Sequence, residues 1–267
     1  MNQNAFAASK NSLNPRLSRR AALKAGAGLA ATMALGLPLA AAPANQRVVV
    51  VWSERTAPKD VYPNDINGAI AEGLQGLAGW EVVTANIDQP DQGLSDELLK
   101  RTDVLMWWGH KRHDEVKDQL VERIVRRVKE EGMGFIALHS SHFAKPYRKL
   151  MGTRCSWGEY VADGTSVKVI VKAPQHPIAK GVKDFDLPKI ERYGEPFAVP
   201  EPETLVLDGI YKKPDGSTAP GRMGLCWTVG KGRVFYFTPG HETYNDFFRP
   251  DVRLILRNAV EWAAPNK

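Results

Sequence analysis

The feature that most constrains the fold is a set of short apolar runs in which polar and apolar residues do not alternate. Residues 47–52 (RVVVVW), 103–109 (DVLMWWG) and 133–138 (MGFIAL) are rich in branched and aromatic side chains. A strand without alternation is buried on both faces, as in a parallel sheet covered by helices. Residues 80–87 (WEVVTANI) predict a fourth, weaker strand.

Helical patterns separate these runs. Residues 66–78 and 95–101 predict short helices, and Ser95 is the expected N-cap of the second. Residues 115–131 carry an apolar stripe at helical spacing, with Gly132 as the expected stop. Strands that alternate with helices predict a doubly wound α/β sheet in one large domain.

The pattern changes in the C-terminal half. Residues 166–172 (SVKVIVK) alternate in part, which predicts a half-exposed antiparallel strand. Residues 173–222, rich in Pro, Gly and charge, are interpreted as an elaborated insertion rather than a second domain. Two strand runs around GKG within 224–240 predict a hairpin, and a closing helix is expected from Pro250. The predicted fold class is α/β: a three-layer sandwich with a mostly parallel sheet and an antiparallel elaboration in the C-terminal half.

The N-terminus reads as an export signal. The basic segment SRRAALK (18–24) precedes an alanine-rich apolar stretch at 25–42, and small residues follow. This order is typical of a secretory signal of the twin-arginine type. Cleavage after Ala42 or Ala44 would leave a periplasmic or secreted protein with no stable membrane span, because the stretch is shorter than the ~20 residues that a spanning helix needs. The alternative is an uncleaved anchor.

The expected domains are therefore a signal peptide at 1–44 and a single domain at 45–267. The signal holds five basic residues and no acidic one, so removing it reduces the net charge from +6 to +1. No basic stripe remains, and a nucleic-acid partner is not expected. Cys155 and Cys226 could form one disulfide in an exported protein, although a single pair of cysteines does not indicate a disulfide-rich fold.

Five of the six histidines fall at or just beyond the carboxyl end of a predicted strand. They are His110 and His113 after the run at 103–109, His139 and His142 after the run at 133–138, and His241 after the hairpin. Ligands bind at that edge of open α/β sheets. His176 lies off this pattern and is interpreted as a loop residue.

A metal site is the first interpretation of this cluster. Imidazole is a common ligand for zinc and similar divalent ions, and a catalytic site needs about three protein ligands with one open position. The pool that would supply them is His110, His139, His142 and His241. The candidate carboxylates, as ligands or bases, are Glu54, Glu195 and Glu242. Without a metal, the same imidazoles would act as acids and bases.

A serine nucleophile is the alternative for the stretch GFIALHSSHF at 134–143. A tight turn from strand to helix presents the residue at its apex, so Ser140 or Ser141 with a histidine and Glu242 could form a triad. The stretch lacks the glycines that flank a nucleophile elbow, and an imidazole occupies the expected apex.

Seven aromatic residues lie close in sequence to these motifs. They suit either the faces of sugar rings or packing in the core: Trp107, Trp108, Trp157, Tyr193, Tyr244, Phe247 and Phe248.

Several motifs in order carry a resemblance to a known family. VLMWWGHKRHDEV, GFIALHSSHF, KLMGT, RYGEPF, VFYFTPGHETY and NAVEWAA closely resemble the ThuA-like trehalose-utilisation family, over residues 47–265. The resemblance implies a flavodoxin-like fold related to class I glutamine amidotransferases, and a link to disaccharide or 3-keto-glycoside metabolism. The amidotransferase cysteine would fall near His139 or Ser140, so thiolate chemistry is not expected. Glu54 matches the family pattern, but the histidine expected soon after it is missing.

The resulting hypothesis is an exported, metal-assisted lyase or isomerase of carbohydrate metabolism. A ketone at C3 acidifies the proton at C2, and a base could remove it while a zinc-like ion stabilises the enediolate. The roles expected are ligands His139, His142 and His241, a base Glu195 or Glu54, and an acid His113. The alternative is a non-catalytic sugar-binding accessory protein. A small carbohydrate is the expected ligand in both cases. Assembly of the protein into a homo-oligomer is compatible with either hypothesis.

Overall fold

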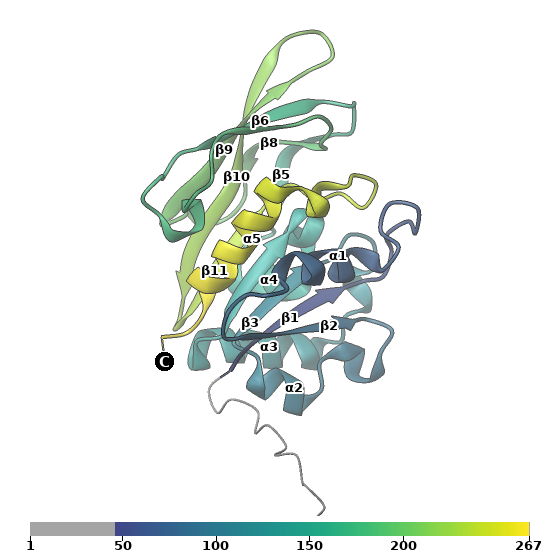
Figure 1. Cartoon of the computed structure of the whole chain (residues 1–267), viewed down its shortest axis with the longest axis vertical. Coiled ribbons are helices and arrows are strands. Elements are labelled where there is room, and N and C mark those ends of the chain that lie inside the picture. The colour runs from purple at the N-terminus through teal and green to yellow at the C-terminus, as the bar shows by residue number, and fades with distance from the viewer. Residues whose placement is uncertain (1–45, 267) are drawn as a thin grey trace, which may run out of the picture. The chain divides into compact units, whose positions relative to one another are not determined.

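The computed structural model describes residues 46–266, and the expected signal peptide lies outside them. Figure 1 shows a large sheet with helices packed against it. In the described part of the chain, nine strands form this sheet in the order β2-β1-β3-β4-β11-β10-β9-β6-β7, and β5 and β8 form a separate pair. The strands are β1 (Arg47–Ser53), β2 (Trp80–Asn86), β3 (Val104–Trp108), β4 (Gly134–Leu138), β5 (Trp157–Val161), β6 (Ser166–Val171), β7 (Phe185–Leu187), β8 (Arg192–Phe197), β9 (Thr204–Lys212), β10 (Thr218–Val229) and β11 (Gly232–Phe237).

Helices cover both faces of the parallel half of the sheet. Alternate residues of one strand enter two separate cores: Val49 and Val51 of β1 on one face, Val50 and Trp52 on the other. The first core contains apolar residues of α1 (Asp65–Leu74) and α5 (Pro250–Ala263). The second contains those of α2 (Asp96–Arg101), α3 (Asp118–Glu131) and α4 (Lys145–Met151). The predicted three-layer α/β sandwich is therefore confirmed (Figure 1).

Local sequence signals correctly predict where several of the helices begin or end. Ser95 caps α2, accepting a hydrogen bond from the backbone N–H of Leu98 at 3.2 Å. Gly132 stops α3 in a left-handed conformation with φ 83°, which a residue without Cβ adopts at little cost. α3 begins at Asp118 rather than near residue 115, because the preceding residues form the short 3-10 turn η2 (His113–Glu115).

The parallel strands bring their carboxyl ends to one edge. β1 pairs in parallel with β2 and β3, β3 with β4, and β4 with β11. The register places Ser53 opposite Trp108, Trp108 opposite Leu138, and Leu138 opposite Phe237. Four strands thus end side by side, and the residues that follow each of them are neighbours in space.

The C-terminal half extends the same sheet with antiparallel strands. The GKG hairpin joins β10 to β11, and β9, β6 and β7 continue outward from β10. The insertion at 173–222 contains strands rather than only loops, and its β8 pairs with β5 beside the main sheet. Cys155 and Cys226 are both buried and free. Across residues 46–266, none of the helices has the length and apolar character that crossing a bilayer requires.

A matched pair of isoleucines tests the position of the core. Ile136 in β4 is fully buried, whereas Ile210 in β9 is 39% exposed. Ile136→Ala is expected to lower the free energy of unfolding by about 2–5 kcal/mol, through lost burial and the cavity left behind. Ile210→Ala is expected to change it by less than about 0.5 kcal/mol. Urea unfolding of the two variants checks the difference, and equal losses would contradict the layer assignment.

Candidate functional site

Three histidines from separate segments converge at the carboxyl edge of the sheet. His110 follows β3, His139 follows β4, and His241 follows β11. Their ring centroids lie 5.1–5.9 Å apart. One nitrogen of each ring lies within 4.8 Å of the others, a spacing that could accommodate a metal ion. We call this group the three-imidazole cluster.

His139 occupies a strained position at the apex of a strand-to-helix turn. The chain turns from β4 directly into the 3-10 helix η3 (His139–Phe143), and His139 has φ 53°. A non-glycine residue in this region carries about 1–3 kcal/mol of strain, and such residues gather at functional sites. Its Nδ1 lies 3.0 Å from the carbonyl oxygen of Thr238, to which it donates. Its Nε2 faces the cluster and contacts the hydroxyl of Tyr193 at 3.4 Å.

Glu54 shapes the loop that carries His110. Its Oε2 accepts hydrogen bonds from three successive backbone N–H groups, of His110 (2.8 Å), Lys111 (2.7 Å) and Arg112 (2.9 Å). Successive N–H groups that converge in this way form an anion-binding nest. A Cβ on Gly109 would lie 2.8 Å from Oε1 of Glu54, so only glycine fits there. The carboxylate of Glu54 thus orients His110 from within the protein.

The turn before His241 also requires glycine. Gly240 has φ 117°, and a Cβ there would collide with the ring of Phe247. The carbonyl oxygen of Gly240 accepts a hydrogen bond from Nε1 of Trp108 at 2.9 Å. Nδ1 of His241 lies 2.8 Å from Oγ1 of Thr243. The other ring nitrogen, Nε2, is directed at the carboxylates described next.

Glu191 joins two of the imidazoles. Its Oε2 lies 3.2 Å from Nε2 of His139, and its Oε1 lies 3.1 Å from Nε2 of His241. Burial opposes ionisation of Glu191, but hydrogen bonds with these two histidines outweigh it and hold its pKa below the usual range. Glu191 is therefore a buried carboxylate at neutral pH, placed between two ring nitrogens.

Glu242 supplies a second carboxylate to the cluster. Its Oε2 lies 3.3 Å from Nε2 of His241, and its Oε1 lies 3.6 Å from Nε2 of His110. Burial opposes its ionisation, but a contact of 2.6 Å with Nζ of Lys111 outweighs it, and its pKa is lowered. Burial also lowers the pKa of His110 to about 4, despite the attraction of Glu242. His110 is thus a neutral imidazole at pH 7, the form that binds metals.

An aromatic cavity opens beside the cluster, with a volume of about 300 Å³. Ligand pockets typically span ~300–1,000 Å³ and combine apolar walls with a few polar groups. Tyr160 donates to Oε1 of Glu191 at 2.6 Å, so the polar end of the cavity adjoins the cluster. The rings of Trp157 and Tyr193 stack 5.8 Å apart in its wall. The lining residues are His110, Ser140, His142, Phe143, Trp157, Tyr160 and Tyr193.

His142 lines this cavity but lies outside the three-imidazole cluster. Its Nδ1 donates to the carbonyl oxygen of Cys155 at 2.7 Å, and burial lowers its pKa to about 3. Ser141 is structural, since its hydroxyl donates to the carbonyl of Trp107 and accepts from the N–H of Gly109. Ser140 contacts Nδ1 of His110 at 2.6 Å.

Three of the residues expected to act as base or acid lie apart from the cluster. Glu54 is engaged by backbone N–H groups as described, and Nδ1 of His113 lies 3.4 Å from its Oε1. Arg222 of β10 donates to both carboxylate oxygens of Glu195, at 2.8 and 2.9 Å. The sequence reasoning missed Glu191. Its only signal was an acidic residue two positions before Tyr193, beside the RYGEPF motif that drew attention to Glu195.

Comparisons with known proteins give a family and a fold. The family model ThuA, described as trehalose utilisation, matches residues 47–263. A ThuA-like protein from Bacteroides uniformis has 18% identity and a TM-score of 0.56, over 85% of this chain and 95% of its own. A cytoplasmic protein from Salmonella typhimurium has 15% identity and a TM-score of 0.57, over 82% and 99%. A glutamine amidotransferase from Thermotoga maritima has 11% identity and a TM-score of 0.51, over 82% and 98%. No curated protein matches the chain in sequence. At these identities the solved structures establish the fold alone.

The role of Glu54 can be tested by unfolding. Glu54→Ala would leave three N–H groups without their acceptor, and we expect a loss of about 2–5 kcal/mol in the free energy of unfolding. Glu130, exposed on α3, is the matched control, and Glu130→Ala is expected to change it by less than about 0.5 kcal/mol. Urea titration checks both variants. A loss for Glu54→Ala as small as that of the control would show that the loop does not depend on this carboxylate.

Proposed function

The chain belongs to the ThuA family of trehalose utilisation, and on that premise we propose that it is a metal-assisted enzyme acting on a disaccharide or 3-keto-glycoside. The observation that carries the proposal is the convergence of three imidazoles and two carboxylates beside an aromatic cavity. Aromatic walls suit the apolar faces of sugar rings, and the polar cluster supplies groups that could act on a sugar carbonyl.

The donor set fits a divalent ion of the zinc type. His110, His139 and His241 would hold it through Nε2, which faces the carboxylates of the cluster. Nδ1 of the rings is engaged by Ser140 Oγ at His110, by Thr238 O at His139, and by both Oγ1 and the backbone N–H of Thr243 at His241. Metal-binding histidines are usually fixed through their second nitrogen in this way. Three imidazoles with an adjacent carboxylate are typical of zinc and related late first-row ions. When bound, the ion would stabilise negative charge on an oxygen of the substrate.

Glu191 is the base in this proposal, in place of Glu54 and Glu195, because it is the carboxylate that lies between Nε2 of His139 and Nε2 of His241. A C3 ketone makes the proton on C2 acidic. Glu191 takes that proton, and the electrons of the C2–H bond form a C2–C3 double bond with negative charge on the ketone oxygen. In elimination, those electrons return to form a C1–C2 double bond, the C3 ketone reforms, and the C1–O bond breaks. Isomerisation reprotonates the intermediate instead.

Tyr160 is the donor that the cavity offers to a leaving oxygen. Burial and its contact with Glu191 raise its pKa to about 12, so the phenol keeps its proton at neutral pH. Its hydroxyl lies 2.6 Å from Oε1 of Glu191, which would let the carboxylate that receives a proton replenish the phenol. General acid catalysis of this kind contributes about 10²–10⁴-fold to a rate.

A serine hydrolase is a second candidate, favoured by one contact. Oγ of Ser140 lies 2.6 Å from Nδ1 of His110, whose Nε2 lies 3.6 Å from Oε1 of Glu242. This line of three groups has the order of a nucleophile, a base and an orienting acid. Activity that survives in Ser140→Ala would exclude this candidate, since that variant lacks the nucleophile.

We also propose export through the twin-arginine route to the periplasm or the medium. The paired arginines and the apolar stretch in residues 18–42 support this, although they lie outside the described residues. Replacement of Arg19 and Arg20 by lysine, followed by cell fractionation, tests it. Retention of the uncleaved chain in the cytoplasm is expected, and unchanged export would contradict the route.

Metal analysis tests the first part of the proposal. Purified protein is expected to hold about one divalent ion per chain, and His139→Ala and His241→Ala are each expected to weaken its binding by at least about 10-fold. His176→Ala, which removes a histidine far from the cluster in sequence, is the matched control and should bind like the wild type. Elemental analysis and calorimetric titration with Zn²⁺ provide the measurements. A wild type that binds no ion would exclude metal assistance.

Substrate turnover tests the second part. Incubation with 3-keto-disaccharides, followed by NMR with and without a chelator, should show metal-dependent loss of the substrate. Glu191→Gln is expected to lower kcat by about 10²–10⁴-fold because the amide cannot accept the proton. Glu130→Gln is the control. Sugar binding with no turnover of any member of the panel would instead identify a binding protein.

A further inference from the structure

The hydroxyl of Tyr193 contacts three polar groups of the site. Tyr193 lies on β8 and is 4% exposed. Its Oη lies 3.2 Å from Oγ of Ser140, 3.2 Å from Oε2 of Glu191 and 3.4 Å from Nε2 of His139. Burial raises the pKa of Tyr193 well above its usual range, so the phenol keeps its one proton at neutral pH.

These contacts continue to His110. Oγ of the buried Ser140 lies 2.6 Å from Nδ1 of His110 on one side and 3.2 Å from the Tyr193 hydroxyl on the other. A continuous line thus runs from Nδ1 of His110 through the two hydroxyls to Oε2 of Glu191. Because each hydroxyl has one proton to donate, the protons along the line must all point the same way. We call this line the Ser140–Tyr193 chain.

The carboxylates near its two ends decide the direction of the chain. Ionised Glu191 can only accept, and hydrogen bonds to an ionised acceptor are about twice as strong as neutral ones. In the opposite direction, Nε2 of His110 would point its proton at Oε1 of Glu242, which at 3.6 Å is too far for a hydrogen bond. Tyr193 therefore donates to Glu191, and Ser140 donates to Tyr193. Nδ1 of His110 in turn donates to Ser140.

We propose that Tyr193 is a positioning residue that sets the tautomer of His110 from a distance, through Ser140. With its proton on Nδ1, the ring of His110 presents the lone pair of Nε2 to the three-imidazole cluster, as a metal ligand must. The purpose of this arrangement rests on the proposed metal site, whereas the direction of the chain does not depend on an ion.

The same direction opposes the serine-hydrolase candidate. A serine nucleophile needs an imidazole nitrogen that accepts its proton, but Nδ1 of His110 already carries a proton when it donates to Ser140. Tyr193 therefore separates the two candidate functions. Its hydroxyl draws the proton of Ser140 away from His110 and holds the imidazole in the form that binds metals.

Loss of the Tyr193 hydroxyl is expected to reverse the chain. In Tyr193→Phe, the hydroxyl of Ser140 keeps one hydrogen-bond partner among residues 46–266, Nδ1 of His110. The cost of leaving this buried hydroxyl unpaired corresponds to a change of at least about 5-fold in a two-state ratio. Ser140 then donates to Nδ1, and the imidazole carries its proton on Nε2, although Tyr193 and His110 are not hydrogen-bonded to each other.

NMR of the metal-free protein tests the proposal, because protonated and unprotonated ring nitrogens have distinct nitrogen shifts. Protein with isotope-labelled histidine is freed of metal by a chelator and measured at pH 7, where the lowered pKa of His110 keeps its ring neutral. The signals of His110 are those missing from His110→Gln. We expect the Nδ1–H form in the wild type. Tyr193→Phe and Ser140→Ala should each raise the ratio of the Nε2–H to the Nδ1–H form at least about 5-fold. Their double variant should change it no further than Ser140→Ala alone, since both act through one chain.

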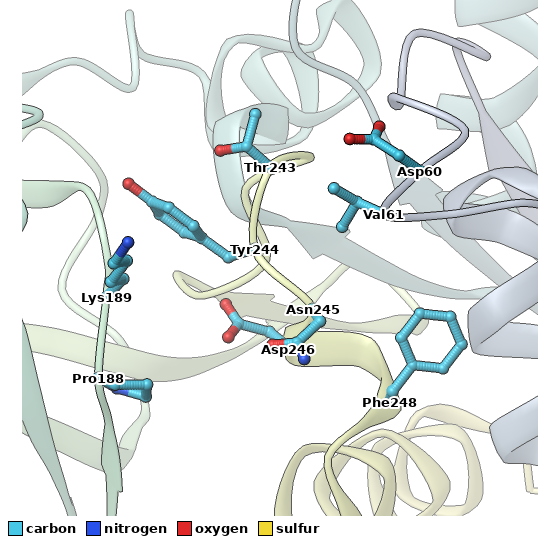
Figure 2. Close-up of a pocket in the computed structure, with 9 residues that line it drawn as sticks. All are labelled: Asp60, Val61, Pro188, Lys189, Thr243, Tyr244, Asn245, Asp246 and Phe248. Atoms are coloured by element: carbon cyan, nitrogen blue, oxygen red, sulfur yellow. The ribbon is translucent and has the colours of Figure 1, made fainter.

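Tyr244 provides the matched control. Its ring also lies near the cluster, 5.2 Å from that of His241. Figure 2 shows that Tyr244 instead belongs to a second pocket, of about 530 Å³, where it lies on the same side as Lys189. Its hydroxyl is not a member of the Ser140–Tyr193 chain, so Tyr244→Phe should leave the tautomer of His110 as in the wild type.

The outcomes separate this role from the proposed function. An Nε2–H form in the wild type would overturn the proposal, as would an unchanged ratio in Tyr193→Phe or an equal change in Tyr244→Phe. The wild type and Ser140→Ala keep the test valid if Tyr193→Phe does not fold. Ratios that change as expected support the chain even in a protein that binds no ion, in which case the metal proposal fails alone. If Zn²⁺ binds, Tyr193→Phe should weaken it at least about 5-fold, since the ring must first return to the Nδ1–H form; an unchanged affinity would contradict the role of the chain.

Discussion

The shared carboxyl edge of four parallel strands is the constraint on which the rest of the structure depends. In-register pairing places Ser53, Trp108, Leu138 and Phe237 side by side, so that all four strands leave the sheet at the same level. Because every one of these strands is buried on both faces, none can slip by one residue without moving apolar side chains into the wrong layer. The same burial that stabilises the sheet therefore fixes where the loops that carry the clustered histidines begin.

Polar contacts and unusual backbone turns give the loops at this edge their shape. Glu54 gathers three N–H groups of one loop, and Gly240 allows a backbone conformation that other residues avoid. His139 sits at φ 53°, with its imidazole anchored to the carbonyl of Thr238. A carboxylate and two unusual turns thus convert the end of a regular sheet into a cluster whose ring nitrogens converge. The fold supplies the edge, and these groups supply the site.

Sequence reasoning predicted that the histidines gather at one edge, but it did not predict the carboxylate of Glu191 that lies between two of them. Strand-end position identified His110, His139 and His241 because the rule it uses, that parallel strands end at one edge, holds whatever the loop conformation. It favoured Glu195 over Glu191, since both lie in or beside one motif and only contacts distinguish them. Arg222, on a strand distant in sequence, binds Glu195 and leaves Glu191 to face the imidazoles.

The sequence by itself determined the layered α/β architecture, the order of strands and helices in the parallel half, and the gathering of histidines at one edge. These features follow from hydrophobic periodicity, helix capping and the pattern of buried residues, all of which can be recognised in short stretches of the sequence. Only the tertiary structure decided which ring nitrogens converge, that Glu54 serves the backbone, and that a second pocket lies beyond Tyr244. These depend on turn conformations and on hydrogen bonds between residues far apart in sequence, as between His139 and Thr238, and no local pattern encodes them.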